Sequence, residues 1–111
     1  MSRMPTYFIS HGGGPWPWMR EQTGGRYDRL EASLQAMAKE TEGRVRAILM
    51  VTAHWETPAF ALSSSPQPGM IYDYYGFPEH TYQVHYRAPG SPELAQRAQA
   101  LLQGGGMSAR L

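Results

Sequence analysis

The feature that most constrains the fold is an almost continuous apolar run, VRAILMV, at residues 45–51. A run of this length without polar alternation is typical of a strand that is covered on both faces, as in a parallel sheet. A second short β-prone run, TYFIS at Thr6–Ser10, also predicts a strand. Both predicted strands are short, and a long stretch of chain separates them.

That intervening chain carries a helical pattern. Apolar side chains recur there at spacings of three and four residues, at Tyr27, Leu30, Leu34 and Met37. Gly43 follows as a natural end of the helix. Strand, helix and strand in this order predict a βαβ unit with a right-handed crossover. We therefore expect an α/β fold with a partial open sheet built on a βαβ unit.

Two further elements are predicted after this unit. FALSSS at Phe60–Ser65 reads as a third strand, and residues 66–89 as an ordered loop. Ser91 and Pro92 then have the residue types of an N-cap and a first helical position. This second helix is expected to end at Gly104 and to bury one stripe, made of Leu94, Ala98, Leu101 and Leu102.

Size and composition exclude several classes of protein. A chain of 111 residues allows one small domain. The absence of cysteine excludes disulfides and thiolate chemistry. A net charge of +1 without a basic cluster argues against nucleic acid as a partner. The chain has neither an apolar run of about 20 residues, which a membrane span needs, nor a signal peptide, so a cytoplasmic protein with no membrane partner is expected.

Two histidines occupy equivalent places in the predicted βαβ unit. His11 directly follows the first predicted strand, and His54 lies just beyond the second. The carboxyl ends of neighbouring parallel strands meet at one edge of a sheet, where α/β proteins bind ligands. A single histidine at a strand end is more often a hydrogen-bonded loop residue. Two histidines in equivalent positions make a binding site for Fe(II) or Zn(II) as good an interpretation as two hydrogen-bonded loop residues.

The other candidate groups are weaker. His80 and His85 are five residues apart in a predicted loop, which favours surface or packing roles for both. Carboxylates could supply a third metal ligand, but nothing in their spacing singles one out; they are Glu56, Asp73 and Glu79. The tryptophans are more often packing residues, although Trp55, next to His54, could form the wall of a pocket.

The run HGGGPWPW at residues 11–18 has two interpretations. Its glycines permit left-handed backbone and close approach of a ligand to main-chain N–H groups. HGGG is also the oxyanion-hole loop of some lipases and esterases, but that chemistry needs a G-x-S-x-G nucleophile elbow, which the sequence lacks. A hydrolase is therefore a weak alternative, and the run does not have the spacing of a phosphate-binding loop.

Four sequence blocks together resemble one known family. They are FISHGGGPW at residues 8–16, VTAHWET at 51–57, YDYYGFPEHTYQVHY at 72–86 and APGSPELAQRAQALL at 88–102. Their order is that of the DOPA-dioxygenase-type extradiol dioxygenases, within the class III superfamily that includes protocatechuate 4,5-dioxygenase. The resemblance extends over nearly the whole chain, and the combination of blocks is specific.

The resemblance implies a non-haem metal enzyme that opens a catecholic ring with O2 beside its hydroxyls. Fe(II), or the Zn(II) described for some members, is the implied cofactor, and the partners are a small catecholic substrate and O2. His11 matches the first metal-ligand histidine of the family and His54 the second. The aromatic block at residues 72–86 matches a pocket-forming segment, so Tyr75 and Phe77, together with Trp55 beside His54, are the expected substrate-binding residues.

Members of this family are more than twice as long as this chain. Their base histidine and last metal ligand come from sequence that would follow Leu111, so residues 1–111 are expected to be the N-terminal part of one catalytic domain, inactive alone. A non-catalytic metal-binding half-site remains a second alternative. The unpaired edges of so small a sheet also favour a homo-oligomer.

Overall fold

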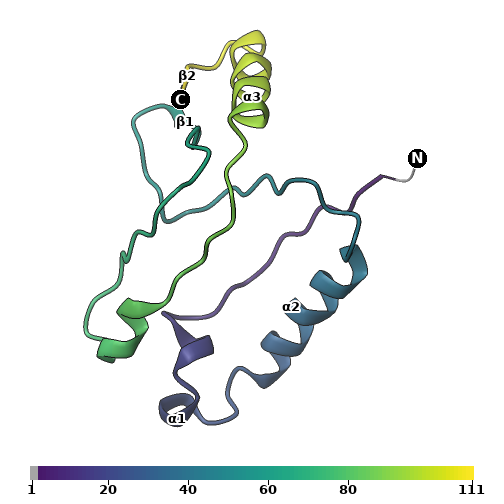
Figure 1. Cartoon of the computed structure of the whole chain (residues 1–111). Helices are drawn as coiled ribbons and strands as arrows, with labels where there is room; N and C mark the ends of the chain where they lie inside the picture. The colour runs from purple at the N-terminus through teal and green to yellow at the C-terminus, as the bar shows by residue number, and fades with distance from the viewer. Residues whose placement is uncertain (1–2) are drawn as a thin grey trace. The chain divides into compact units, whose positions relative to one another are not determined.

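The computed structural model describes residues 3–111. These residues form two compact units, which are described separately below. The N-terminal unit consists of residues 3–48 and 74–84, and the C-terminal unit of residues 49–73 and 85–111. Figure 1 shows the elements in chain order: η1 (Trp16–Trp18), α1 (Arg20–Thr23), α2 (Asp28–Thr41), β1 (Phe60–Ala61), η2 (Glu79–Gln83), α3 (Pro92–Gly104) and β2 (Ala109–Arg110).

Helix α2 confirms the helix predicted between the two apolar runs. Its least exposed positions include those of the predicted stripe, although none of its side chains is fully buried. Asp28 and Glu31 lie in its first turn and Lys39 in its last, so the charges match the helix dipole. The helix ends before Gly43, which adopts a φ of +75°. This left-handed conformation is one that glycine adopts without steric cost.

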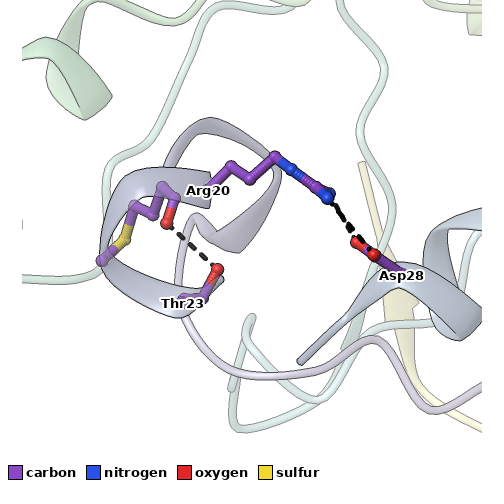
Figure 2. Close-up of polar contacts among 4 residues, drawn as sticks. Arg20, Thr23 and Asp28 are labelled. Atoms are coloured by element: carbon purple, nitrogen blue, oxygen red, sulfur yellow. Dashed lines mark hydrogen bonds and ion pairs between the residues drawn. The ribbon is translucent and has the colours of Figure 1, made fainter. Parts of the chain in front are cut away.

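An ion pair connects α1 to the first residue of α2. Arg20 Nη1 lies 2.5 Å from Asp28 Oδ1, and the two side chains point toward one another across the turn (Figure 2). In the same turn, Thr23 Oγ1 donates a hydrogen bond to the carbonyl oxygen of Met19 at 3.0 Å. Both members of the ion pair are at least half exposed, so its contribution to stability is small. Its effect is to fix the path of the chain between the two helices.

The C-terminal unit contains the small sheet and α3. Ser91 caps α3 as predicted, because its Oγ accepts a hydrogen bond from the Leu94 N–H at 3.2 Å. Strands β1 and β2 pair in parallel, with Phe60 opposite Ala109. Their parallel direction requires a crossover, and α3 lies within it and contacts β2. Buried Ala95 and Ala109 form the small core of this unit.

The fold class is thus confirmed in coarse form, as a mixed α/β chain with a two-stranded parallel open sheet, but the predicted strands are partly wrong. Residues 6–10 and 45–51 form no strand, and the third predicted strand shortens to Phe60–Ala61. The βαβ unit predicted across α2 is therefore not formed; the parallel pair flanks α3 instead.

The physical reason is the lack of a pairing partner. An apolar segment becomes a strand only where another segment offers its backbone N–H and C=O groups. Nothing within the described chain does so beside residues 6–10 or 45–51, and their apolar side chains are exposed, with Phe8 fully and Val51 91% exposed. One stripe residue of α3 is also misassigned, since Leu101 is 70% exposed. No helix within residues 3–111 has the length and apolar character needed to cross a bilayer.

Candidate metal centre

His11 lies in a loop that aromatic side chains hold tightly. Trp16 is buried and stacks on Tyr27, with ring centroids 4.9 Å apart and planes inclined by 18°. Its indole Nε1 donates a hydrogen bond of 2.6 Å to the carbonyl oxygen of His11. The His11 side chain itself is exposed, and its Nδ1 lies 2.8 Å from the carbonyl oxygen of Gly12. The Trp16 indole therefore restrains the main chain of His11, and the Gly12 carbonyl oxygen restrains its ring.

The glycines that follow His11 are required by this packing. Gly12 and Gly14 have φ values of +79° and +56°. A Cβ on Gly12 would lie 2.6 Å from Trp16 Nε1, and one on Gly14 would lie 2.4 Å from Phe77 Cζ. Gly13 donates its N–H to Tyr27 Oη at 3.3 Å. The left-handed backbone expected of HGGG is confirmed, and these contacts give the run a packing role.

His54 is held by a carboxylate. Its Nδ1 lies 2.6 Å from Asp73 Oδ2, and the two side chains are 55% and 40% exposed. The main-chain N–H of His54 also donates a hydrogen bond to Thr52 Oγ1 at 3.1 Å, which restrains the backbone at this residue. All three residues belong to the C-terminal unit. Asp73, one of three candidate third ligands by residue type, is thus a direct partner of His54.

The two histidines share one chemical property. A carbonyl oxygen and a carboxylate oxygen accept hydrogen bonds, so each Nδ1 carries the proton that it donates. In a neutral imidazole this places the lone pair on Nε2. A histidine that binds a metal through one nitrogen normally donates from the other to a carboxylate or a carbonyl. Both histidines therefore suit a Fe(II) or Zn(II) ion bound through Nε2.

The expected substrate-binding residues lie in both units. Tyr75 is 90% exposed and Phe77 is half-buried against Gly14 in the N-terminal unit, whereas Trp55 follows His54 in the C-terminal unit and is 48% exposed. His80 Nε2 lies 2.6 Å from the carbonyl oxygen of Trp18, which is a structural contact of the kind expected for it.

The aromatic block contains a cluster that the sequence did not single out. The Tyr74 ring packs edge-on against Phe77 and lies 5.1 Å from the ring of Tyr82. Its hydroxyl donates to the carbonyl oxygen of Thr81 at 2.6 Å, and Thr81 is fully buried. The density of aromatic residues in the block was the available signal. The cluster fixes the segment that carries Phe77.

Within residues 3–111, no three histidine or carboxylate side chains lie close enough together to enclose a metal ion. None of the three candidate carboxylates therefore completes a set of three with histidines in the described part of the chain. The pairing of Asp73 with His54 could not have been read from the sequence, because a separation of 19 residues in irregular chain carries no periodic signal.

Comparison with known proteins defines the class of this chain. Residues 5–111 match the family described as the catalytic LigB subunit of aromatic ring-opening dioxygenase. The chain belongs to this family, which confirms the resemblance seen in its four sequence blocks.

Individual relatives agree with this assignment. The chain is 37% identical over 112 residues to "Dioxygenase tasH" of Hapsidospora irregularis, covering 96% of this chain and 34% of that protein. Two proteins named "4,5-DOPA dioxygenase extradiol" are similar over 101 residues and 91% of this chain. The one from Beta vulgaris is 41% identical, with 36% of its length covered, and the one from Escherichia coli (strain K12) is 40% identical, with 34% covered. The chain thus spans about a third of the length of these relatives. No solved structure matches it.

Proposed function

We propose that this chain provides two ligands of the metal centre of an extradiol dioxygenase, an enzyme that opens a catecholic ring with O2 beside its hydroxyl groups. The match to a ring-opening dioxygenase family over residues 5–111 supports the reaction class. The names of the relatives support a DOPA-like catechol as substrate. The observation that carries the proposal is that His11 and His54 both direct the Nδ1 proton to an oxygen, which leaves Nε2 as the donor atom.

His11 and His54 are the residues that would hold the metal. When bound there, Fe(II) would bring the catecholate and O2 together and let electron density pass from the ring to oxygen. Zinc has no redox chemistry of its own, so Fe(II) is the metal we propose for ring cleavage. The resemblance implies a further ligand and a base histidine, and we assign neither role to a residue of this chain.

The chain's own residues would bind and orient the substrate. Tyr75 exposes 90% of its surface and Trp55 48%, so both rings are accessible to an aromatic ligand. Phe77 is held in place by Tyr74 and by its contact with Gly14. Aromatic rings prefer offset or edge-to-face contacts with one another, which would orient a flat catechol. A homo-oligomer remains part of the proposal, because residues 6–10 and 45–51 form no strand within the described chain and expose apolar side chains.

A chimera tests this proposal directly. Residues 1–111 would replace the matching segment of the Escherichia coli relative, whose remaining length supplies the rest of the protein. We expect the iron-loaded chimera to consume O2 in the presence of DOPA and to form a coloured ring-opened product. His11→Ala and His54→Ala should each abolish both signals, whereas His85→Ala, which changes an exposed histidine without an assigned role, should leave them unchanged.

Three results would contradict the proposal. A folded chimera that binds iron but consumes no O2 with any catechol would favour the alternative of a non-catalytic metal-binding half-site. Full activity in either histidine variant would exclude that residue as a ligand. Release of product from a generic ester would favour the hydrolase alternative instead.

A further inference from the structure

We infer that Asp73 is a positioning residue, which holds the His54 ring in the tautomer protonated at Nδ1 and so presents Nε2 as the metal donor. The inference rests on the proposed function in one respect, namely that His54 is a ligand. It adds to that proposal a specific role for a side chain that contacts neither metal nor substrate.

The contact between the two side chains is short and directional. The distance of 2.6 Å between Asp73 Oδ2 and His54 Nδ1 is slightly shorter than the range of about 2.7–2.9 Å that is usual for charge-assisted N–H···O hydrogen bonds. The two residues are 19 positions apart, so the contact is made by the fold of the C-terminal unit and is not a local turn. The hydrogen bond from the His54 N–H to Thr52 Oγ1 fixes the backbone at the same residue. Ring and backbone are therefore restrained from two directions.

This geometry favours positioning over direct ligation by Asp73. The carboxylate contacts the ring nitrogen that carries the proton, and the lone pair that could bind a metal is on the other nitrogen. A carboxylate in this position fixes both the tautomer and the orientation of the imidazole ring. The Nδ1 of His11 instead faces the main-chain carbonyl oxygen of Gly12, which no side-chain substitution removes. Substitution of Asp73 can therefore test what sets the tautomer of His54.

The test uses the whole chain with Zn(II) alone as the probe. The variants are Asp73→Ala, which removes the acceptor, and Asp73→Asn, whose amide oxygen can still accept the Nδ1 proton. Glu93→Gln is the matched control, since it also removes one negative charge from the C-terminal unit. Two quantities are measured: the tautomer of His54, from long-range ¹H–¹⁵N correlation spectra without metal, and the dissociation constant for zinc.

We expect wild-type His54 to carry its proton on Nδ1, and Asp73→Ala to shift it toward a mixture of tautomers. Zinc affinity should fall by about 10- to 100-fold in Asp73→Ala, the range typical of lost partners of metal-binding histidines. Asp73→Asn should recover the Nδ1–H tautomer and part of the affinity. Glu93→Gln should behave as wild type. Since Asp73 is 40% exposed, far-ultraviolet circular dichroism should show that all variants fold alike.

The two readouts separate this inference from the proposed function. Zinc affinity that is unaffected by His54→Ala would contradict the role of His54 as a ligand, while the spectra would still decide what sets its tautomer. If zinc binding requires His54 but Asp73→Ala changes neither tautomer nor affinity, the inference is wrong and the proposed function stands. A proton on Nε2 in the wild-type chain would also overturn the inference.

Discussion

The loops that carry His11 and His54 reach the same chemical result by different means. Each histidine follows an apolar segment, and each directs its Nδ1 proton to an oxygen. In the His11 loop the oxygen is a backbone carbonyl, and the buried Trp16 and close-packed glycines hold the surrounding chain. In the His54 loop the oxygen belongs to the exposed side chain of Asp73.

This difference separates stability from metal binding. Substitutions in the His11 loop remove packing that the N-terminal unit depends on, so they should lower the free energy of unfolding. Substitution of Asp73 removes one exposed hydrogen bond and should change metal affinity with little effect on unfolding. The predictions below test this contrast, beginning with the largest expected effect on stability.

Gly14→Ala should have the largest effect. The new Cβ would face both a φ of +56° and the Phe77 ring at 2.4 Å, so we expect the free energy of unfolding to fall by about 2–3 kcal/mol. Gly43→Ala is the matched control, because Gly43 has a φ of +75° with no atom within 4 Å of the Cβ position. It should cost only the conformational strain, about 1 kcal/mol. Equal losses in urea denaturation would show that Phe77 does not pack on Gly14.

Trp16→Phe should have a smaller effect. Phenylalanine keeps an aromatic ring against Tyr27 but cannot donate to the His11 carbonyl oxygen, so we expect a loss of about 1 kcal/mol in the free energy of unfolding. The His11 resonances should also broaden in nuclear magnetic resonance spectra, because the backbone at His11 loses a restraint. Unchanged stability and unchanged His11 resonances would contradict the account of this loop.

Asp73→Ala should leave stability nearly unchanged, within about 0.5 kcal/mol, as is usual for exposed positions. The same variant is expected to show the largest loss of zinc affinity apart from the histidine variants themselves. Thermal unfolding and zinc titration on one sample measure both quantities. A large loss of stability without a change in zinc affinity would reverse the contrast between the two loops.

The smallest effect concerns the segment before His11. Tyr7 Oη donates a hydrogen bond of 2.5 Å to Glu40 on α2, and this bond raises the pKa of Tyr7 above its ordinary value of 10.0. A pKa that is higher in the folded state adds stability below pH 10, and this contribution is lost as the pH rises through the folded pKa. Ultraviolet titration should detect a late-ionising tyrosine that Tyr7→Phe removes. A titration curve whose alkaline end is the same in wild type and Tyr7→Phe would contradict this contact.

The sequence predicted those parts of the fold that depend on local pattern. The stripe of α2 and the Ser91 cap of α3 were visible because helices satisfy their hydrogen bonds locally. Residues 6–10 and 45–51 could not be judged in this way, since a strand depends on a partner that local sequence does not specify.

The same distinction applies to the candidate site. His11 and His54 were identified by residue type and by their places after apolar runs. The contact of Asp73 with the His54 ring, and the packing of Phe77 on Gly14 in the His11 loop, each join residues far apart in the chain. No spacing rule predicts such pairs in irregular chain, so the structure was needed to find them.

The most direct test of the central claim is an anaerobic Fe(II) titration of the wild-type chain, His11→Ala and His54→Ala. The account predicts one bound Fe(II) per wild-type chain and loss of that binding in both variants. Unchanged binding in either variant would show that the substituted histidine is not a ligand and would contradict the proposed function.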